Sequence, residues 1–412
     1  MSIDLEALYT DLHQHPELSF QETRTAGIAA GHLRDLGLEV EEGVGITGVV
    51  GVFRNPSTGS GRRADGPVVW ARADMDALPV EELTGLPYAS TATGIDPAGH
   101  AVPIMHACGH DMHVTAMIGA VERLVAERDS WSGTLVVLIQ PAEEYGAGSR
   151  AMLDAGLLER YPKPDIVLGQ HVTPLPAGII GVRPGPQMAA ADGIRVTMHG
   201  RGGHGSRPHT TIDPVVMAAA TVMRLQTIAS RELDPQGVGV VTVGSIHAGT
   251  KSNIIAADAT LELSLRYPDD ETREKVMASV KRIVRAEATA SGAEVEPEFH
   301  TEHTLPPTIN DADATARVTA ALTRVLGEGT VIDPGMFTGS EDVSWFARDA
   351  GAPLVFWFWG GVDAAMYAAA DAAGTLAASI PTNHSAYFAP VPHPTIEVGV
   401  TAMATAVREF MA

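Results

Sequence analysis

The chain has 412 residues, more than one ordinary hydrophobic core holds, so we expect two domains. Apolar residues make up 45% and charged residues 19%, which is typical of a globular protein and excludes a disordered one. Acidic residues outnumber basic ones by 50 to 28, a net charge of -22, so we expect neither nucleic-acid binding nor docking on an anionic membrane.

Cysteine usage and the N-terminal segment both indicate where the protein works. Cys108 is the single cysteine, so no intrachain disulfide can form, which fits a reducing compartment. The first ten residues carry Asp4 and Glu6 and no basic stretch, unlike a signal peptide. No run of about 18 apolar residues is long enough to span a membrane. We therefore expect a cytoplasmic protein.

The N-terminal third predicts two helices followed by two strands. Amphipathic helices are expected over residues 4–14 and 21–37, the second ending at a glycine that can cap it. A strand over 47–53 and a buried strand over 67–73 follow. Between them, residues 55–66 are rich in Gly, Ser, Pro and Arg, which indicates a surface loop to which we assign no role.

Three further short runs, rich in β-branched and aromatic residues, predict strands over 134–140, 165–169 and 354–359. Helical patterns lie between the earlier ones, such as residues 114–127. Strands that alternate with helices predict an α/β fold whose mostly parallel sheet is covered by helices on both faces.

The middle of the chain has a different pattern. Its predicted elements are a strand (193–199), a helix (213–229), two strands (239–246 and 259–266) and a second helix (271–290). We therefore expect a smaller α+β domain over residues 188–299, inserted into a discontinuous catalytic domain made of residues 1–187 and 300–412.

Ionisable residues follow three of the predicted strands. Asp74 and Asp76 come directly after one, Glu143 and Glu144 after the next, and His171 after a third. Because parallel sheets bind ligands beyond the carboxyl ends of their strands, we expect these groups to meet at one edge.

The segment His106–His113 (HACGHDMH) is the strongest single signal. Cys108 and His110 stand two residues apart, so a thiolate and an imidazole can reach one metal ion, and Gly109 permits a tight turn between them. A helix cap with solvent-facing histidines is the alternative, but the ionisable groups at the strand ends favour a metal centre.

Two adjacent carboxylates, Glu143 and Glu144, follow a buried strand, where like charges repel unless a cation neutralises them. One can bind a metal ion while the other accepts a proton from water. His171 and His384 would each pass as a packed histidine if taken alone, but together they complete a set of metal ligands.

The inserted domain contributes weaker signals. The glycine-rich segment 200–209 lacks the Lys-Ser/Thr ending of a phosphate loop, so we expect it to place His204 near a substrate, although an ordinary glycine hairpin remains open. Asn253 and Arg266 have the donors to bind a carboxylate, with a turn Asn and a surface Arg as the alternative. Ser340 lies outside any Gly-x-Ser-x-Gly elbow, so we interpret it as a turn or cap residue.

The ordered set of motifs resembles the aminoacylase/carboxypeptidase-type co-catalytic metallohydrolases. Within this family the chain looks most like the branch of hippurate hydrolases, N-acyl-amino-acid amidohydrolases and indole-acetyl-amino-acid hydrolases. The likeness covers nearly the whole chain in the order HQHPELSFQE, RADMDALPVEE, MHACGHDMH, QPAEE, GQHV, GRGGHGSRPH, SNIIA, GSEDVSWF and NHSAYF.

This resemblance implies a site with two divalent metal ions, zinc or manganese, with cobalt or nickel as further options. Glu143 would be the general base. The implied ligands are Cys108 as a bridging thiolate, His110, Glu144, His171 and His384.

The resemblance also implies that the inserted domain is a lid and the surface of a homodimer. Its His204 would bind substrate or stabilise the oxyanion, often from the partner subunit, and Asn253 and Arg266 would anchor the substrate. The wider family has His-x-Asp where this chain has Asp74-Met-Asp76, and Asp where Cys108 stands. Both departures are typical of the amidohydrolase branch. They leave the role of Asp74 and Asp76 open, with orientation of the ligands as the favoured interpretation.

The expected function is metal-dependent hydrolysis of the amide bond of N-acyl amino acids, which releases a carboxylic acid and a free amino acid. A dipeptidase or carboxypeptidase on the same scaffold is one alternative. A non-catalytic relative that binds acyl-amino acids is the other.

Overall fold

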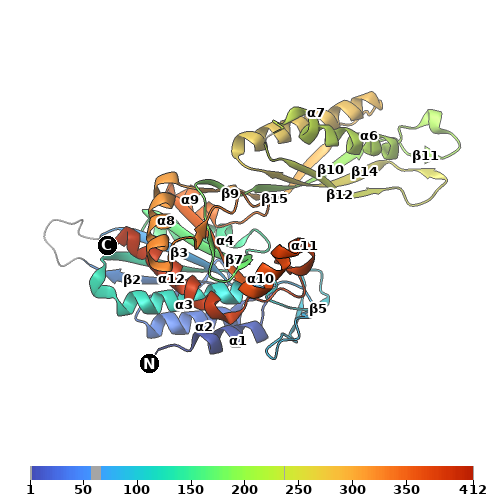
Figure 1. Ribbon diagram of the computed structural model, residues 1–412. Coiled ribbons are helices and arrows are strands. Elements are labelled where there is room, and N and C mark those ends of the chain that lie inside the picture. Colours follow the sequence, from blue (N-terminus) through green and yellow to red (C-terminus); the bar gives the residue numbers. More distant parts are fainter. Residues whose placement is uncertain (1, 57–65, 236, 412) are drawn as a thin grey trace. The chain divides into compact units, whose positions relative to one another are not determined.

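The computed structural model describes residues 2–56, 66–235 and 237–411 (Figure 1). Most of the loop predicted over 55–66 lies outside these ranges. The chain forms two compact units. The large unit comprises Met1–Gln187, Ile309–Gly335 and Asp342–Ala412, and the small unit comprises Met188–Thr308 and Met336–Glu341.

A large sheet runs through the large unit, in the order β1-β2-β6-β3-β7-β18-β8-β17. Its four central strands, β6, β3, β7 and β18, run parallel, which confirms the predicted mostly parallel sheet. The strands are β1 (Glu39–Val44), β2 (Gly48–Asn55), β3 (Val68–Asp74), β6 (Gly133–Gln140), β7 (Ile166–Pro176), β8 (Ile180–Gly181), β17 (Val331–Ile332) and β18 (Leu354–Val362). A separate hairpin pairs β4 (Thr93–Ile95) with β5 (Ala101–Pro103).

Helices cover both faces of this sheet. Val69 and Ala71 of β3 belong to the core that the sheet forms with α3 and α12, whereas Trp70, pointing the other way, packs edge-to-face against Phe346 of α9. The helices of the large unit are α1 (Leu5–Gln14), α2 (Thr23–Asp35), α3 (His110–Ala126), α4 (Gly148–Asp154), α5 (Leu157–Arg160), α8 (Ala312–Leu326), α9 (Ser344–Ala350), α10 (Ala364–Ala372), α11 (Leu376–Ser379) and α12 (Pro392–Met411).

Helix α3 begins at His110, four residues before the predicted start. The preceding Gly109 has φ +80°, a left-handed conformation that lets the chain turn into the helix without strain. The sequence did not predict this start, because the polar residues His110 and Asp111 do not continue the apolar pattern of the helix. In the structure both side chains are fully buried.

Strand β7 is longer than the predicted run over 165–169. It extends from Ile166 to Pro176, so the expectation that His171 follows the strand end is wrong. His171 lies inside the strand, in register with Phe358 of β18. The polar residues after Gly169 interrupt the apolar pattern, so the sequence did not show the second half of the strand. Pairing with β18 extends β7 through these residues.

The small unit has an antiparallel four-stranded sheet, in the order β12-β14-β10-β15, with α6 and α7 on one face (Figure 1). In α7, Val276, Val280, Ile283 and Val284 are buried, a spacing that places one apolar stripe against the sheet. Strand β15 was not predicted, because its sequence EFHTEHTL is mostly polar and exposed. The elements are β10 (Ala190–His199), β11 (Gly203–His204), α6 (Pro214–Thr227), β12 (Val240–Ala248), β13 (Ile254–Ile255), β14 (Asp258–Tyr267), α7 (Asp270–Ala290) and β15 (Glu298–Leu305).

Two short strands, β9 (Gly185–Met188) and β16 (Thr308–Asn310), lie where the chain passes from one unit to the other. None of the helices in the described part of the chain is both long enough and apolar enough to span a bilayer.

Candidate metal centre

The carboxyl ends of the central strands hold a cluster of ionisable side chains. The last residue of β3, Asp74, pairs in register with Gln140, the last residue of β6. The loop that follows β6 carries Glu143 and Glu144, and the neighbouring β7 carries His171. Parallel pairing therefore brings together residues that are far apart in the sequence, as expected for ligand sites in such sheets.

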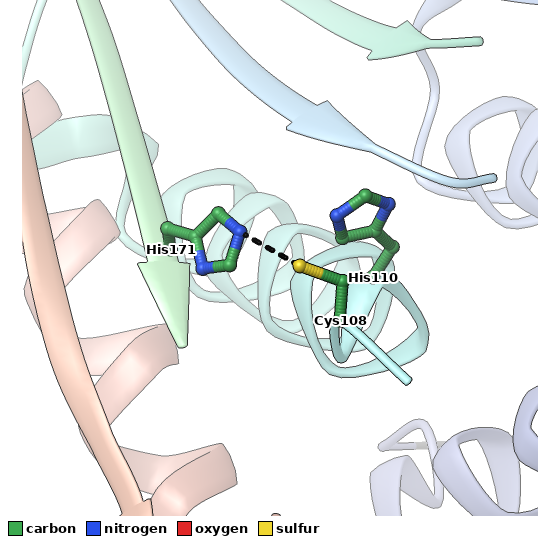
Figure 2. Close-up of side chains that lie close together, drawn as sticks. All are labelled: Cys108, His110 and His171. Carbon is green, nitrogen blue, oxygen red and sulfur yellow. Dashed lines mark hydrogen bonds between the residues drawn. The ribbon is translucent and has the colours of Figure 1, made fainter. Parts of the chain in front are cut away.

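Five side chains form overlapping groups whose potential ligand atoms lie within 4.8 Å of one another. One group is Cys108, His110 and His171, with Cys108 Sγ 3.4 Å from His171 Nε2 (Figure 2). A second group is Cys108, Glu144 and His384, in which His384 Nε2 lies 3.4 Å from Glu144 Oε2. Cys108 belongs to both groups, so the two groups share its sulfur atom.

The segment with His384 is tied to the rest of the cluster by hydrogen bonds. The His384 N–H donates to the Ala107 carbonyl at 2.8 Å, and the Asn383 amide donates to the carbonyls of Cys108 and Val172, each at 3.2 Å. Asn383 therefore joins His384, the start of α3 and β7. Sequence reasoning missed this role, because Asn383 carries no signal apart from its neighbour His384.

Hydrogen bonds leave free ligand atoms that point into the cluster. His171 Nδ1 donates to the Val172 carbonyl at 2.7 Å, so Nε2 keeps its lone pair toward Cys108. His110 Nδ1 lies 3.3 Å from Asp76 Oδ1, while the buried His110 Nε2 and Glu144 Oε1 have no hydrogen-bond partner within the described ranges. Buried polar atoms without partners cost free energy, so a divalent cation fits these residues.

The charge balance of the cluster also favours a cation. Although burial lowers it, the carboxylates of Asp74 and Asp76 raise the pKa of His110 to about 10. Burial raises the pKa of the Cys108 thiol well above its usual range, and Glu144 and Glu143 raise it further. The carboxylates thus demand positive charge, which a proton on His110 supplies when no metal ion is bound.

His171 behaves differently from the other histidines of the cluster. Burial lowers the pKa of His171 well below its usual value, and the neighbouring His113 lowers it further. The imidazole therefore stays neutral, the form that binds metal ions. A hydrogen bond with Glu144 raises the pKa of the more exposed His384.

Asp76 connects the ligands to the loop after β6. Its two oxygens accept hydrogen bonds from the backbone N–H groups of Glu143 at 3.1 Å and Glu144 at 3.0 Å, and from Ser19 Oγ at 2.7 Å. The same carboxylate contacts His110. Asp76 therefore holds both the ring of His110 and the loop after β6.

His113 lies close enough to Asp74 and His110 to share a metal ion with them, but both nitrogens of its ring already form hydrogen bonds. Its Nδ1 is hydrogen-bonded to Asp74, and its Nε2 accepts from the Val172 N–H at 2.9 Å. An accepting Nε2 has no lone pair left for a metal ion. His113 therefore holds Asp74 and β7 in place.

Arg72 is the centre of a buried ion-pair network next to the cluster, which sequence reasoning missed. Arg72, fully buried in β3, donates to Asp74 at 2.7 Å, to Gln140 at 2.8 Å and to Asp342 at 3.1 Å. The signal was present, since an arginine inside the apolar run of a central strand needs buried partners.

Three predicted substrate residues lie in the small unit. His204 is exposed on β11, and its Nδ1 accepts from the Ser206 N–H at 3.1 Å, which leaves Nε2–H as a donor. Asn253 is exposed beside β13, and its carbonyl accepts from the Gly205 N–H at 2.8 Å. Arg266 of β14 is hydrogen-bonded to Ser340 Oγ. Their roles stay predictions.

Comparisons with known proteins bear on this cluster. A family model described as Peptidase family M20/M25/M40 matches residues 70–387. Thermostable carboxypeptidase 1 of Saccharolobus solfataricus is 38% identical over 85% of this chain and 84% of its own length. Hippurate hydrolase of Campylobacter jejuni is 36% identical over 84% of this chain and 85% of its own.

A solved structure also indicates this family. The YXEP protein of Bacillus subtilis, described as a dinuclear metal binding peptidase from the M20 family, has a TM-score of 0.77 and 29% identity to this chain. The match covers 99% of this chain and 98% of that one. These findings confirm the family resemblance that the ordered motifs indicated.

Proposed function

The chain belongs to the peptidase family M20/M25/M40, and on this basis we propose that it hydrolyses the amide bond of N-acyl amino acids. The products are a carboxylic acid and a free amino acid. The observation that carries the proposal is the overlap of metal-ligand groups through Cys108, directly beside the paired carboxylates Glu143 and Glu144.

We propose that two divalent ions are held by Cys108, His110, Glu144, His171 and His384. When bound, such ions polarise an amide carbonyl and make water a stronger nucleophile at neutral pH. The mixed thiolate, imidazole and carboxylate set suits zinc or manganese, with cobalt or nickel as further options. A thiolate ligand must stay reduced, which supports a cytoplasmic location for the protein.

Glu143 is the proposed general base. Its backbone N–H donates to Asp76. Its carboxylate lies in one cluster with the side chains of His110 and Glu144. Glu143 would accept a proton from the attacking water and deliver it to the leaving nitrogen. In the small unit, the Nε2–H of His204 is a donor suited to negative charge on the carbonyl oxygen, and Arg266 and Asn253 are suited to the substrate carboxylate.

The test separates proton transfer from metal binding. Glu143→Gln should lower kcat about 1,000-fold while the protein keeps its metal ions, because the amide cannot accept the proton. Glu144→Gln should instead lower the metal content, because it removes a ligand charge. Steady-state kinetics and elemental analysis of both variants measure the two effects. Near-normal turnover of Glu143→Gln would refute the assigned base.

A carboxypeptidase activity is the second candidate, favoured by the relative named thermostable carboxypeptidase 1. The metal-loaded enzyme should hydrolyse N-acetyl and N-benzoyl amino acids faster than peptides with free C-termini. The opposite order would make the chain a carboxypeptidase. Absence of any chelator-sensitive hydrolysis across both panels would favour the non-catalytic binding relative.

The small unit is the proposed lid and homodimer surface. Its two edge strands differ: β15 carries the charged residues Glu298 and Glu302, whereas β12 exposes Ile246. Charged edges resist strand pairing, and an apolar edge invites it. A second copy is therefore expected to pair along β12.

A lysine substitution on each edge tests the pairing. The wild-type chain of 43.2 kDa should sediment as a dimer, and Ile246→Lys should shift it toward the monomer. Thr301→Lys, the matched change on β15, should leave the dimer intact. A monomeric wild-type protein, or equal effects of both variants, would contradict this arrangement.

A further inference from the structure

Two carboxylates hold the loop after β6, residues 141–147, by hydrogen bonds to its backbone. We call it the paired-glutamate loop. Three consecutive backbone N–H groups bond to carboxylate oxygens: Ala142 to Glu22 Oε1 at 2.8 Å, Glu143 to Asp76 Oδ1 at 3.1 Å and Glu144 to Asp76 Oδ2 at 3.0 Å. Asp76 also contacts His110 and so belongs to the metal centre. Glu22 does not, so the metal centre by itself does not account for its position.

Glu22 comes from the start of α2, 120 residues before the loop. Its side chain is fully buried, and its second oxygen accepts from Thr47 Oγ1 at 2.6 Å. Burial and the negative charge of Asp76 raise the pKa of Glu22 to about 7, so its charge is costly where it lies. A carboxyl group kept at such a place calls for a role beyond packing.

Capping of its own helix is not that role. Glu22 stands at the N-cap position of α2, but its side chain makes no hydrogen bond to the first turn of the helix. Glu17 does so instead, because its carboxylate accepts from the N–H groups of Arg24 at 2.9 Å and Thr25 at 2.8 Å. The Glu22 carboxyl is therefore directed at the paired-glutamate loop.

The peptide that Glu22 binds is strained and tightly packed. Ala142 has φ +45°, in the left-handed region that non-glycine residues rarely adopt. Its carbonyl accepts from the Gly148 N–H at 3.1 Å, and a Cβ on Gly148 would meet the Pro141 carbonyl oxygen at 1.5 Å. The structure around Ala142 thus holds a conformation that the chain would not take by itself, and Glu143 is the next residue.

We propose that Glu22 is a positioning residue for Glu143. Its carboxyl group holds the N–H of Ala142, keeps that residue left-handed and so fixes the direction in which the Glu143 side chain leaves the backbone. Glu22 acts through the loop and touches neither the substrate nor a ligand atom. This inference rests on the proposed function of Glu143 as the general base.

Three variants test the proposal. Glu22→Gln keeps an oxygen for the Ala142 N–H and can donate to Thr47, so its kcat should stay within about threefold of wild type. Glu22→Ala removes the acceptor, so kcat should fall about 100-fold with KM and metal content nearly unchanged, since misplacement by about 1 Å costs that much. Glu17→Ala, the matched truncation in the same segment, should lower thermal stability and leave kcat unchanged.

Hydrogen–deuterium exchange supplies a readout that needs no turnover. Peptides covering residues 141–147 should exchange faster in Glu22→Ala than in wild type, Glu22→Gln or Glu17→Ala, because the alanine variant removes the acceptor of the Ala142 N–H and the other three keep it. Glu22→Asp, which keeps the charge but shortens the side chain, should resemble Glu22→Ala in both assays and serves if the alanine variant does not fold.

Several outcomes overturn the inference. Unchanged kcat in Glu22→Ala or Glu22→Asp would do so, as would a loss of kcat that tracks a loss of bound metal. A Glu22→Gln variant as poor as Glu22→Ala would show that charge, not the acceptor, matters. If Glu143→Gln turns over normally, the proposed base fails, while loop exchange in the Glu22 variants still reports whether Glu22 holds the loop.

Discussion

Hydrogen bonds to each ring nitrogen decide which histidines are available to a metal ion. His110 and His113 come from the same first turn of α3 and are both buried. His113 uses both nitrogens, for Asp74 and for the Val172 N–H, whereas His110 Nε2 has no hydrogen-bond partner in the described residues and lies 3.6 Å from Asp74 Oδ2. The sequence shows the spacing of His110 from Cys108, but it does not show the partners of His113, which come from β3 and β7.

A third histidine, His13, carries a pH-dependent part of the stability. Its Nδ1 lies 2.6 Å from Asp111 and its Nε2 3.1 Å from Glu82, with all three side chains buried. Although burial lowers it, these carboxylates raise the pKa of His13 to about 10. Because the folded value exceeds the unfolded value of about 6.5, the stabilisation is complete below about pH 6.5 and is lost as the pH rises through 10.

The variant His13→Phe should therefore be more costly at low pH than at high pH. At pH 6.5 we expect the free energy of unfolding to fall by about 3 kcal/mol, because two buried carboxylates lose their cation. At pH 9.5 the penalty should be smaller, since wild-type His13 is then losing its proton. Urea unfolding at both pH values measures the difference, and an equal penalty at the two would contradict the assignment.

At the scale of elements, the junction between Cys108 and α3 depends on one backbone conformation. Gly109 has φ +80°, and a Cβ there would lie 2.5 Å from Val172 Cγ1. Any side chain at this position would strain the backbone and would also clash with β7. The turn therefore places the thiol of Cys108 and the ring of His110 on the same side of the sheet edge only if residue 109 is glycine.

Gly109→Ala should lower the free energy of unfolding by about 2 kcal/mol or more and reduce metal content, because the helix start must shift. Gly27→Ala is the matched control: it lies inside α2, and a Cβ there would meet no atom within 4 Å, so it should be neutral or slightly stabilising. Thermal unfolding and elemental analysis of both variants measure this. Full metal content in Gly109→Ala would show that the turn tolerates a side chain.

At the scale of the whole molecule, the proposed ligands join distant segments of the large unit. Cys108 and His110 begin α3, Glu144 follows β6, His171 lies in β7 and His384 precedes α12. Ions bound by all of these segments would stabilise the folded chain over the unfolded one, by an amount that grows with metal concentration.

Removal of metal should therefore change both stability and activity. A strong chelator should abolish hydrolysis and lower Tm, and addition of zinc or manganese should restore both. Calorimetry with parallel activity assays measures the two effects. A chelated protein that keeps its Tm but loses activity would mean that the ions contribute to chemistry and not to folding. Unchanged activity after verified metal loss would contradict the proposed mechanism.

The central strands of the large sheet and the family could be predicted from the sequence alone, whereas β1, β8 and β17 were not predicted. Buried parallel strands are short apolar runs, so β3, β6 and β18 are visible locally, and the ordered motifs identify the family. The proposed ligand types are visible too, because a thiol, imidazoles and paired carboxylates are side chains that bind divalent metal ions.

Only the tertiary structure decided the rest. The polar strand β15, the length of β7 and the hydrogen bonds of His113 all depend on partners distant in the sequence. Glu22 is the clearest case, because nothing near it in the chain indicates that its carboxyl group binds Ala142. Local patterns encode which segments are buried, whereas a hydrogen bond between remote segments exists only once the chain has folded.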